Sequence, residues 1–221
     1  MINIETYISK LIPSLQNRFG AKLLYVGLQG SYLRGEATAN SDIDIMVILD
    51  SLTVSDLDTY REILLSMEHY DKSCGFICSK ADLSAWNPLE ICHLLRSTKN
   101  YYGSLQDYVP AYTELDVRNF VKMSINNLYH ELCHRYIHST AERNEAALPG
   151  TYKGVVFILQ DLHYLNTGKF IATKDELLTQ LEGKHRSVLA RSMAMSRGEA
   201  FDFPESYELL LTWCQEALRC V

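Results

Sequence analysis

Residues 30–47 read GSYLRGEATANSDIDIMV, and this stretch decides both the expected fold and the expected chemistry. A short apolar run, residues 22–28 (KLLYVGL), precedes it. Its own end, from Asp42 onward, begins a second run, residues 42–49 (DIDIMVIL). Each run has the length and composition of a β-strand, and the second alternates acidic with aliphatic residues before an apolar finish. The glycine-serine turn therefore follows one predicted strand, and a pair of aspartates begins the next.

The aspartate pair predicts a metal site. Asp42 and Asp44 are two residues apart, so on a strand both side chains project from the same face. Two neighbouring carboxylates repel one another unless a cation lies between them. Oxygen ligands in this arrangement suit Mg²⁺, which commonly binds one or two carboxylates together with substrate phosphates.

The turn predicts a phosphate site. Gly30 and Ser31 open a short predicted helix over residues 31–37, and backbone N–H groups at such a start attract anions. Glycine also allows a phosphate to approach the backbone closely. Arg34, one helical turn further on, is a candidate charge-assisted donor to the same phosphates. A phosphate site and a metal pair on neighbouring strands are what metal-assisted nucleotidyl transfer requires.

The pattern outside this stretch predicts a two-domain chain. Residues 4–19 and 55–70 repeat apolar residues at helical spacing, and residues 74–78 (CGFIC) form a third short strand. Beyond residue 115 only helices are expected, over residues 115–138, 152–165, 174–181, 185–196 and 206–220, with Pro149-Gly150 breaking the first from the second. The predicted fold is α/β (α+β), a small mixed sheet with flanking helices followed by a C-terminal helical bundle. The expected domains are residues 1–105 and 113–221, with the linker within residues 101–112.

Composition narrows the class of protein. The 221 residues are 47% hydrophobic and 22% charged, which is typical of a globular domain. A net charge of −6 argues against a nucleic-acid partner. Six irregularly spaced cysteines do not resemble a disulfide framework, and neither a signal peptide nor a membrane-spanning run is visible. We therefore expect a reduced, cytoplasmic protein, a monomer or homodimer with no membrane partner.

The string GSYLRGEATANSDIDIMV resembles the signature of the nucleotidyltransferase superfamily related to DNA polymerase beta, in its minimal and antibiotic-modifying branch. Residues 152–178 also resemble the helical substrate-binding domain of kanamycin nucleotidyltransferase and its relatives. The resemblance implies Mg²⁺ and ATP, or another nucleoside triphosphate, as cofactor and co-substrate. It implies that Gly30 and Ser31 bind the β- and γ-phosphates and that Asp42 and Asp44 bind the metal ions.

One departure from that family is visible. The superfamily often places a third carboxylate on the strand after the aspartate pair, and residues 74–78 contain no acid. Either another carboxylate acts as the catalytic base or the protein is catalytically silent. Glu90, at the start of a predicted helix, is the preferred candidate, and Asp82 and Glu114 are the others.

Several further residues carry open interpretations. Lys122, Asn126, His130, His134 and His138 form a polar stripe on the long helix. A His pair at this spacing can bind zinc, but the usual accompanying ligands are missing. We interpret the stripe as solvated or cleft-lining, in which case His130 or Asn126 would contact acceptor or nucleotide. Lys153 is a candidate phosphate ligand. Cys74 and Cys78 are interpreted as small core residues, and Tyr101 and Tyr102 as packing residues rather than base-stacking ones.

The sequence thus predicts an Mg²⁺-dependent nucleotidyltransferase that transfers AMP from ATP to a hydroxyl of a small-molecule acceptor, with an aminoglycoside-type antibiotic as one candidate. The acidic balance suits a cationic acceptor. Two alternatives remain open, namely transfer to a protein or an RNA end, and a silent nucleotide-binding module.

Overall fold

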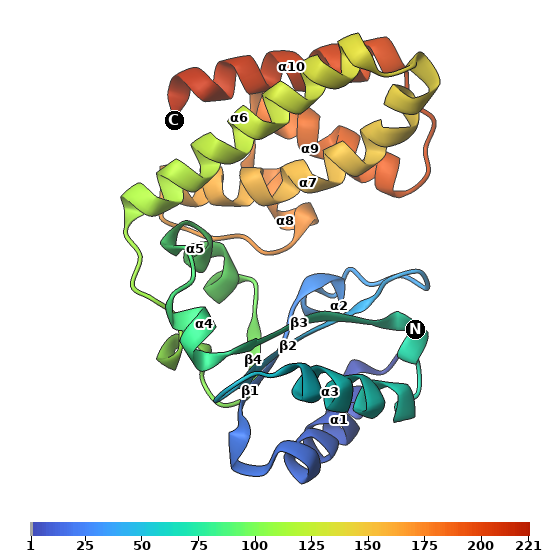
Figure 1. Cartoon of the computed structure of the whole chain (residues 1–221). Coiled ribbons are helices and arrows are strands. Elements are labelled where there is room, and N and C mark those ends of the chain that lie inside the picture. Colours follow the sequence, from blue (N-terminus) through green and yellow to red (C-terminus); the bar gives the residue numbers. More distant parts are fainter. Residues whose placement is uncertain (1) are drawn as a thin grey trace. The chain divides into compact units, whose positions relative to one another are not determined.

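The computed structural model describes residues 2–221. Contacts between Cα atoms divide the chain into two compact units, with the boundary between Ala111 and Tyr112. We call these the first unit and the second unit and describe each by itself. In Figure 1 the first unit contains the sheet and the second consists of helices.

The first unit is built on a four-stranded mixed sheet. Its strands are β1 (Leu23–Leu28), β2 (Ile43–Leu49), β3 (Ser73–Ser79) and β4 (Lys99–Tyr102), in the spatial order β3-β2-β1-β4. β1 is antiparallel to β2 and to β4, whereas β2 and β3 are parallel. The prediction of a small mixed sheet is therefore confirmed.

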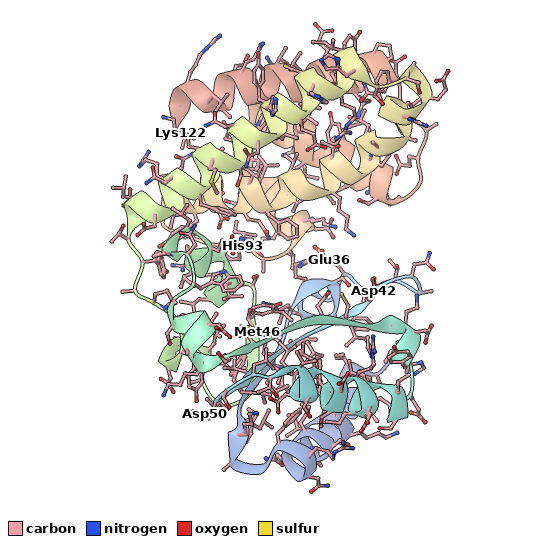
Figure 2. The ribbon with its side chains drawn as sticks, in the orientation of Figure 1. Glu36, Asp42, Met46, Asp50, His93 and Lys122 are labelled. Atoms are coloured by element: carbon pink, nitrogen blue, oxygen red, sulfur yellow. The ribbon has the colours of Figure 1, made fainter. Side chains whose placement is uncertain are left out.

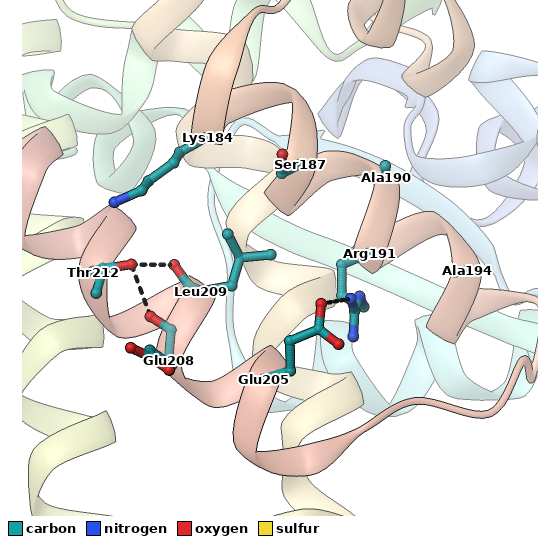
Figure 3. A pocket seen from close by; sticks show the side chains of 9 residues that line it. All are labelled: Lys184, Ser187, Ala190, Arg191, Ala194, Glu205, Glu208, Leu209 and Thr212. Atoms are coloured by element: carbon teal, nitrogen blue, oxygen red, sulfur yellow. Dashed lines mark hydrogen bonds and ion pairs between the residues drawn. The ribbon is translucent and has the colours of Figure 1, made fainter.

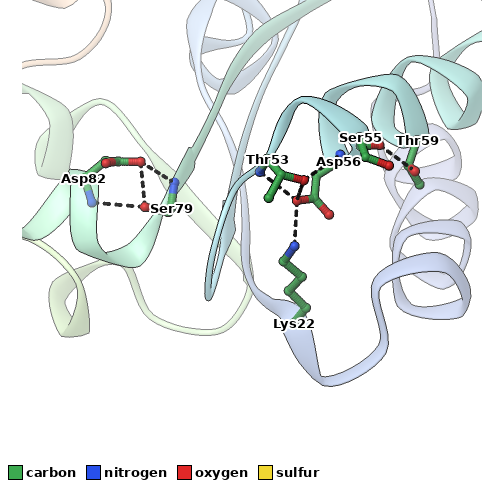
Figure 4. Close-up of polar contacts among 7 residues, drawn as sticks. All are labelled: Lys22, Thr53, Ser55, Asp56, Thr59, Ser79 and Asp82. Carbon is green, nitrogen blue, oxygen red and sulfur yellow. Dashed lines mark hydrogen bonds and ion pairs between the residues drawn. The ribbon is translucent and has the colours of Figure 1, made fainter.

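Five helices and three short 3₁₀ turns complete the first unit. They are α1 (Ile4–Phe19), η1 (Gly20–Lys22), α2 (Gly30–Arg34), α3 (Val54–Ser66), η2 (Tyr70–Lys72), α4 (Lys80–Ser84), α5 (Pro88–Arg96) and η3 (Leu105–Asp107). Two of these helices begin with capping boxes, drawn in Figure 4. The Thr53 hydroxyl donates to Asp56 Oδ2 over 2.6 Å, and the Ser79 hydroxyl donates to Asp82 Oδ2 over the same distance. In each box the backbone N–H of the first residue also donates to the carboxylate, and the backbone N–H of the aspartate donates to the hydroxyl oxygen. These bonds satisfy backbone groups where each helix starts.

Strand β2 is buried on both faces of the sheet except at Asp44, its second residue, which is only partly buried. On one face Ile43, Ile45 and Val47 join a core with residues of α1 and α3. On the other face Met46 and Ile48 join a second core that includes Leu83 of α4, with Leu94 and Leu95 of α5 packed against it. Asp44 precedes Met46 on this second face and is only partly buried. The sheet therefore holds a carboxylate at the rim of an apolar core.

The second unit contains five helices around one hydrophobic core. They are α6 (Glu114–His138), α7 (Ala141–Thr167), α8 (Lys174–Gln180), α9 (Gly183–Ser196) and α10 (Phe203–Cys220). Tyr152 and Trp213, both at most 1% exposed, are the largest side chains of this core. The predicted C-terminal helical bundle is confirmed. Within residues 2–221, no helix is both long and apolar enough to cross a lipid bilayer.

One expectation about a helix is wrong. Pro149-Gly150 does not break the chain, because α7 continues through Pro149. Proline removes one helical hydrogen bond, but Leu148 and Tyr152 on either side are fully buried, and their packing offsets that loss. The linker expected over residues 101–112 contains the boundary between the two units, and only its first two residues belong to strand β4. This four-residue edge strand is held in part by Asn100, which accepts a hydrogen bond from the Tyr25 hydroxyl over 2.7 Å.

Candidate active site

The two aspartates of the sequence motif lie where β2 begins. Asp42 is the residue before the strand and Asp44 is its second residue. The intervening Ile43 and the following Ile45 are at most 2% exposed, whereas Asp42 is exposed and Asp44 is partly exposed. Alternation along the strand therefore turns both carboxylates away from the α1–α3 core. Figure 2 labels Asp42 at this end of the first unit.

The glycine-serine turn touches the aspartate pair. Gly30 has φ +69°, a conformation that favours glycine, and a Cβ on it would lie 1.9 Å from Asp44 Oδ2. The backbone N–H of Gln29 also donates to the Asp44 carbonyl over 2.9 Å. A side chain on Gly30 would therefore force the Asp44 carboxylate to move. The structure thus brings together two parts of the motif that are separated by more than ten residues in sequence.

Ser31 follows in the short helix α2. Its carbonyl accepts hydrogen bonds from the backbone N–H groups that close the helix, including that of Glu36 over 2.9 Å. Its hydroxyl makes no hydrogen bond to any residue in the part of the chain that the structure describes. That hydroxyl is available to a ligand. The helix is shorter than predicted, because Gly35 adopts φ +70° and ends it.

Arg34 is engaged by a neighbouring acid. Its Nε donates to Glu36 Oε2 over 2.9 Å, and the two side chains are only 16% and 19% exposed. The bond uses one of the five N–H donors of the guanidinium. Arg34 is therefore oriented by Glu36, and its predicted contact with phosphate would have to use the remaining donors.

Cys74 on β3 is a site residue that sequence reasoning missed. It pairs in register with Asp44 and is exposed, so its interpretation as a core residue is wrong, whereas Cys78 is buried as expected. Partial burial is the main cause that raises the pKa of the Cys74 thiol. The carboxylates of Asp44, which forms a hydrogen bond with it, and of Asp42 raise that pKa further. One thiol is thus close to both carboxylates. The register between β2 and β3, which the sequence does not specify, decides this contact.

Each candidate for the catalytic base accepts a hydrogen bond from a side chain close to it in sequence. Glu90 Oε2 accepts a hydrogen bond from the Trp86 indole over 2.7 Å, across the start of α5. Asp82 accepts the Ser79 hydroxyl in the α4 capping box, and Glu114 accepts a bond from Arg118 over 3.2 Å in the second unit. The Oε1 oxygen of Glu90 makes no recorded hydrogen bond among the described residues. The Oε1 oxygen of Glu90 could therefore accept a proton from an acceptor hydroxyl.

The remaining predicted residues lie in the second unit. Lys153 is an exposed residue of α7. Asn126, His130, His134 and His138 are exposed along α6, and Lys122 donates from Nζ to the carbonyl of Val221 over 3.1 Å. Figure 2 labels Lys122 on this helix. Successive members of this set are neighbours on the helix surface, and the stripe drifts round the helix from Lys122 to His138.

Two helices of the second unit also line an open surface pocket. It has a volume of about 680 Å³ and is lined by Lys184, Ser187, Ala190, Arg191 and Ala194 of α9 and by Glu205, Glu208, Leu209 and Thr212 of α10. Figure 3 shows Arg191 paired with Glu205, at an Nη2–Oε1 distance of 3.0 Å. None of the predicted site residues lines it.

The residues around Asp42 and Asp44 fit a magnesium ion that is completed by a substrate. No three His, Cys, Asp or Glu side chains within residues 2–221 surround one point as they would in an all-protein metal site. Mg²⁺ usually binds only one or two carboxylates and takes its other ligands from waters and phosphates. An exposed Asp42, a partly exposed Asp44 and a backbone cradle at Gly30 match that requirement.

Comparisons with known proteins identify the family of this chain. Residues 8–94 match the family model described as nucleotidyltransferase domain, and these residues include Gly30, Asp42, Asp44 and Glu90. Protein adenylyltransferase MntA from Thermococcus cleftensis is 37% identical over 68 residues, which are 29% of this chain and 67% of that protein. The fold is similar over 97% of this chain and 99% of the other to spectinomycin adenyltransferase AAD(9) from Enterococcus faecialis, solved with ATP and spectinomycin, with TM-score 0.60 and 18% identity. The chain therefore belongs to the nucleotidyltransferase domain family and is a nucleotidyltransferase enzyme.

Proposed function

We propose that this enzyme transfers AMP from ATP to a hydroxyl group of a small acceptor molecule, with Mg²⁺ bound at Asp42 and Asp44. The observation that carries the proposal is the contact between Gly30 and the Asp44 carboxylate. It joins a backbone suited to phosphate and a carboxylate suited to a metal at one place, as transfer from a nucleoside triphosphate requires.

The triphosphate would be bound by the turn that begins α2. The backbone N–H groups of Gly30 and Ser31 and the unbonded Ser31 hydroxyl would donate to the β- and γ-phosphates. Arg34, held by Glu36, would add charge-assisted hydrogen-bond donors. When bound, Mg²⁺ would orient the triphosphate and neutralise the charge that develops on the leaving pyrophosphate.

The reaction itself is an in-line displacement at the α-phosphorus. The acceptor oxygen forms a bond to that phosphorus while the bond to the bridging oxygen of the β-phosphate breaks, and pyrophosphate leaves. The acceptor proton passes to a carboxylate, for which Glu90 and its Oε1 oxygen are the candidate. Trp86, which donates to the other oxygen, would fix the orientation of the Glu90 side chain.

We assign the two units different tasks. The first unit, corresponding to the catalytic domain expected over residues 1–105, would bind nucleotide and metal. The second unit, corresponding to residues 113–221, would select the acceptor. A fold likeness that extends over 97% of the chain, to an adenyltransferase solved with ATP and spectinomycin, supports a small acceptor and ATP. Lys153 of the second unit is a candidate ligand of the nucleotide.

A protein acceptor is the second candidate, because the curated relative is named a protein adenylyltransferase. That similarity covers only 29% of this chain. The absence of an acid on β3 favours a third candidate, a nucleotide-binding protein without transfer, since Cys74 is the residue in register with Asp44.

A transfer assay separates these candidates. The purified chain is incubated with Mg²⁺ and ATP labelled at the α-phosphate, together with a panel of aminoglycosides and aminocyclitols, and separately with a cell protein extract. Label on a small acceptor supports the proposal, and label on protein alone supports the second candidate. Calorimetric binding of Mg-ATP without transfer to any acceptor would support the silent module, and labelled GTP, CTP and UTP test the choice of nucleotide.

A further inference from the structure

The histidines of the stripe on α6 have no role in the proposed transfer reaction, and their spacing suits a metal ion. His130, His134 and His138 are exposed, and each follows the previous one by four residues. Residues at this spacing are neighbours on a helix surface. The ring centroids of His134 and His138 are 4.7 Å apart, and those of His130 and His134 are 6.0 Å apart.

These two separations differ in a way that matters for metal binding. A zinc-type ion lies about 2.0–2.1 Å from an imidazole nitrogen and hence about 3.2 Å from the ring centroid. The centroids of two ligating rings are therefore about 4.5 Å apart when the ligand–metal–ligand angle is a right angle, and about 5.2 Å apart when it is tetrahedral. The separation between His134 and His138 falls within that interval. A separation of 6.0 Å would require a ligand–metal–ligand angle of roughly 140°, which four-coordinate and six-coordinate ions do not adopt between adjacent ligands.

We propose that His134 and His138 form a chelating site for a divalent transition-metal ion, of the class of Ni²⁺, Cu²⁺ and Zn²⁺, on the last turns of α6. Imidazole is a preferred ligand of these ions. The two rings are inclined at 48°. Rotation about χ2, a soft torsion in histidine, leaves each ring centroid nearly in place and can direct a nitrogen of each ring toward a shared ion.

The surroundings favour a cation at this place. His138 lies in the last turn of α6, where the helix dipole presents partial negative charge. Arg135, the nearest cation on the same turn, is directed toward α7, since its Nη1 donates to Thr151 over 2.9 Å and the side chain is paired with Glu131. The positive charge of Arg135 is thus neutralised by Glu131 and directed away from His134 and His138.

The site has two protein ligands. No group of three or more His, Cys, Asp or Glu side chains suited to a metal exists among residues 2–221, so water molecules would complete the coordination. The site is therefore open, and it is independent of the aspartate motif, which binds through oxygen and belongs to the first unit.

The test is a calorimetric titration of the untagged full-length chain with NiCl₂. His134→Gln and His138→Gln are each expected to weaken Ni²⁺ binding by about tenfold or more, since even outer-shell partners of metal ligands contribute on that order. His130→Gln is the matched control, on the same helix face and equally exposed, and it should leave the affinity unchanged. Circular dichroism checks that all three variants remain folded.

The outcome that would overturn the proposal is equal weakening by all three variants, or unchanged binding in His134→Gln and His138→Gln. A second measurement needs no variant. Paramagnetic Ni²⁺ should broaden the amide signals of residues 134–138 in the wild-type chain at lower concentration than those around the other histidines, and broadening elsewhere first would contradict the site. Because neither experiment uses nucleotide, failure here leaves the proposed transfer reaction untouched.

Discussion

Gly30 is the residue whose conformation most directly links the fold to the proposed chemistry. It has φ +69°, and the Asp44 carboxylate lies where a Cβ would be, so any side chain there would be strained and would displace that carboxylate. Gly35 offers a matched comparison, because it has φ +70° but open space around the Cβ position.

We predict that Gly30→Ala abolishes nucleotidyl transfer, whereas Gly35→Ala retains most of it. Both variants adopt the left-handed conformation at a cost of about 1–2 kcal/mol, so a loss of stability is common to them. Only the first displaces the Asp44 carboxylate. Rates of transfer and urea unfolding curves are measured for both variants. Equal activity of the two would show that the contact between Gly30 and Asp44 has no catalytic importance.

Cys74 supplies a second prediction at the residue scale. It and Cys220 are exposed, whereas Cys78 and Cys214 are buried, and burial raises the pKa of each of those two thiols to about 12. N-ethylmaleimide should therefore label Cys74 and Cys220 first, faster as the pH rises because the thiolate reacts. The adduct on Cys74 would lie beside Asp44 and should stop transfer.

Two variants identify the thiol responsible. Cys220→Ser should still be inactivated by the reagent, and Cys74→Ser should be protected. A wild-type chain that is fully labelled at Cys74 by mass spectrometry yet fully active would refute the placement of Cys74 beside the reacting groups.

Among the elements, helix α3 is fixed at its start by an ion pair as well as a capping box. Lys22 Nζ lies 2.6 Å from Asp56 Oδ2, and Asp56 also accepts bonds from Thr53. The hydrogen bonds from Lys22 and Thr53 lower the pKa of Asp56 from 3.8 to about 2. A carboxyl group whose pKa is depressed by folding stabilises the folded state above its unfolded pKa, and the stabilisation is lost as the pH falls through the folded pKa.

We therefore predict that Asp56→Asn lowers the melting temperature at pH 7 and that the difference from wild type disappears between about pH 4 and pH 2. The control is Asp58→Asn. Asp58 is an exposed residue of the same helix whose side chain makes no hydrogen bond or ion pair with the described residues, so its substitution should have little effect at either pH. Thermal unfolding followed by circular dichroism across this range decides the matter. A difference that persists unchanged at pH 2 would mean that the ion pair does not stabilise the fold.

The elements also show what the sequence could predict and what it could not. The period-two alternation of residues 42–49 was sufficient to predict β2 and the shared face of Asp42 and Asp44, since Ile43 and Ile45 must be buried. Strand β4 was missed because four residues beginning with Lys99 and Asn100 carry no apolar pattern and pair only through contacts distant in sequence. The contact of Cys74 with Asp44 depends on the β2–β3 register, which tertiary packing sets. Pro149 signals a helix break locally, but burial of its neighbours in α7 overrides that signal.

For the molecule as a whole, the important fact is that each unit has its own hydrophobic core. The core of the second unit is formed entirely by residues from Val121 onward, and the two cores of the first unit are formed by residues before Tyr112. A domain of this size, within the usual range of about 50–250 residues, can fold without its neighbour.

We predict that residues 112–221, expressed alone, fold into a cooperative helical domain. The boundary between Ala111 and Tyr112 cuts no helix, because α6 begins at Glu114. Far-ultraviolet circular dichroism should show a helical spectrum and a single sigmoidal thermal transition. A disordered spectrum, or a broad non-cooperative transition, would indicate that the second unit needs the first to fold.

The central claim is that Asp42 and Asp44 act together on a nucleoside triphosphate, and one measurement tests it most directly. Transfer from α-phosphate-labelled ATP is compared for wild type, Asp42→Asn, Asp44→Asn and the control Asp50→Asn, an exposed aspartate just beyond the other end of β2. Each of the first two variants should lose about a hundredfold or more in rate, the effect expected when one charge-stabilising group is removed from such a site. Their thermal stability should be unchanged or higher, because one of two repelling charges is gone, and Asp50→Asn should match wild type. Wild-type rates in either Asp42→Asn or Asp44→Asn would contradict the account.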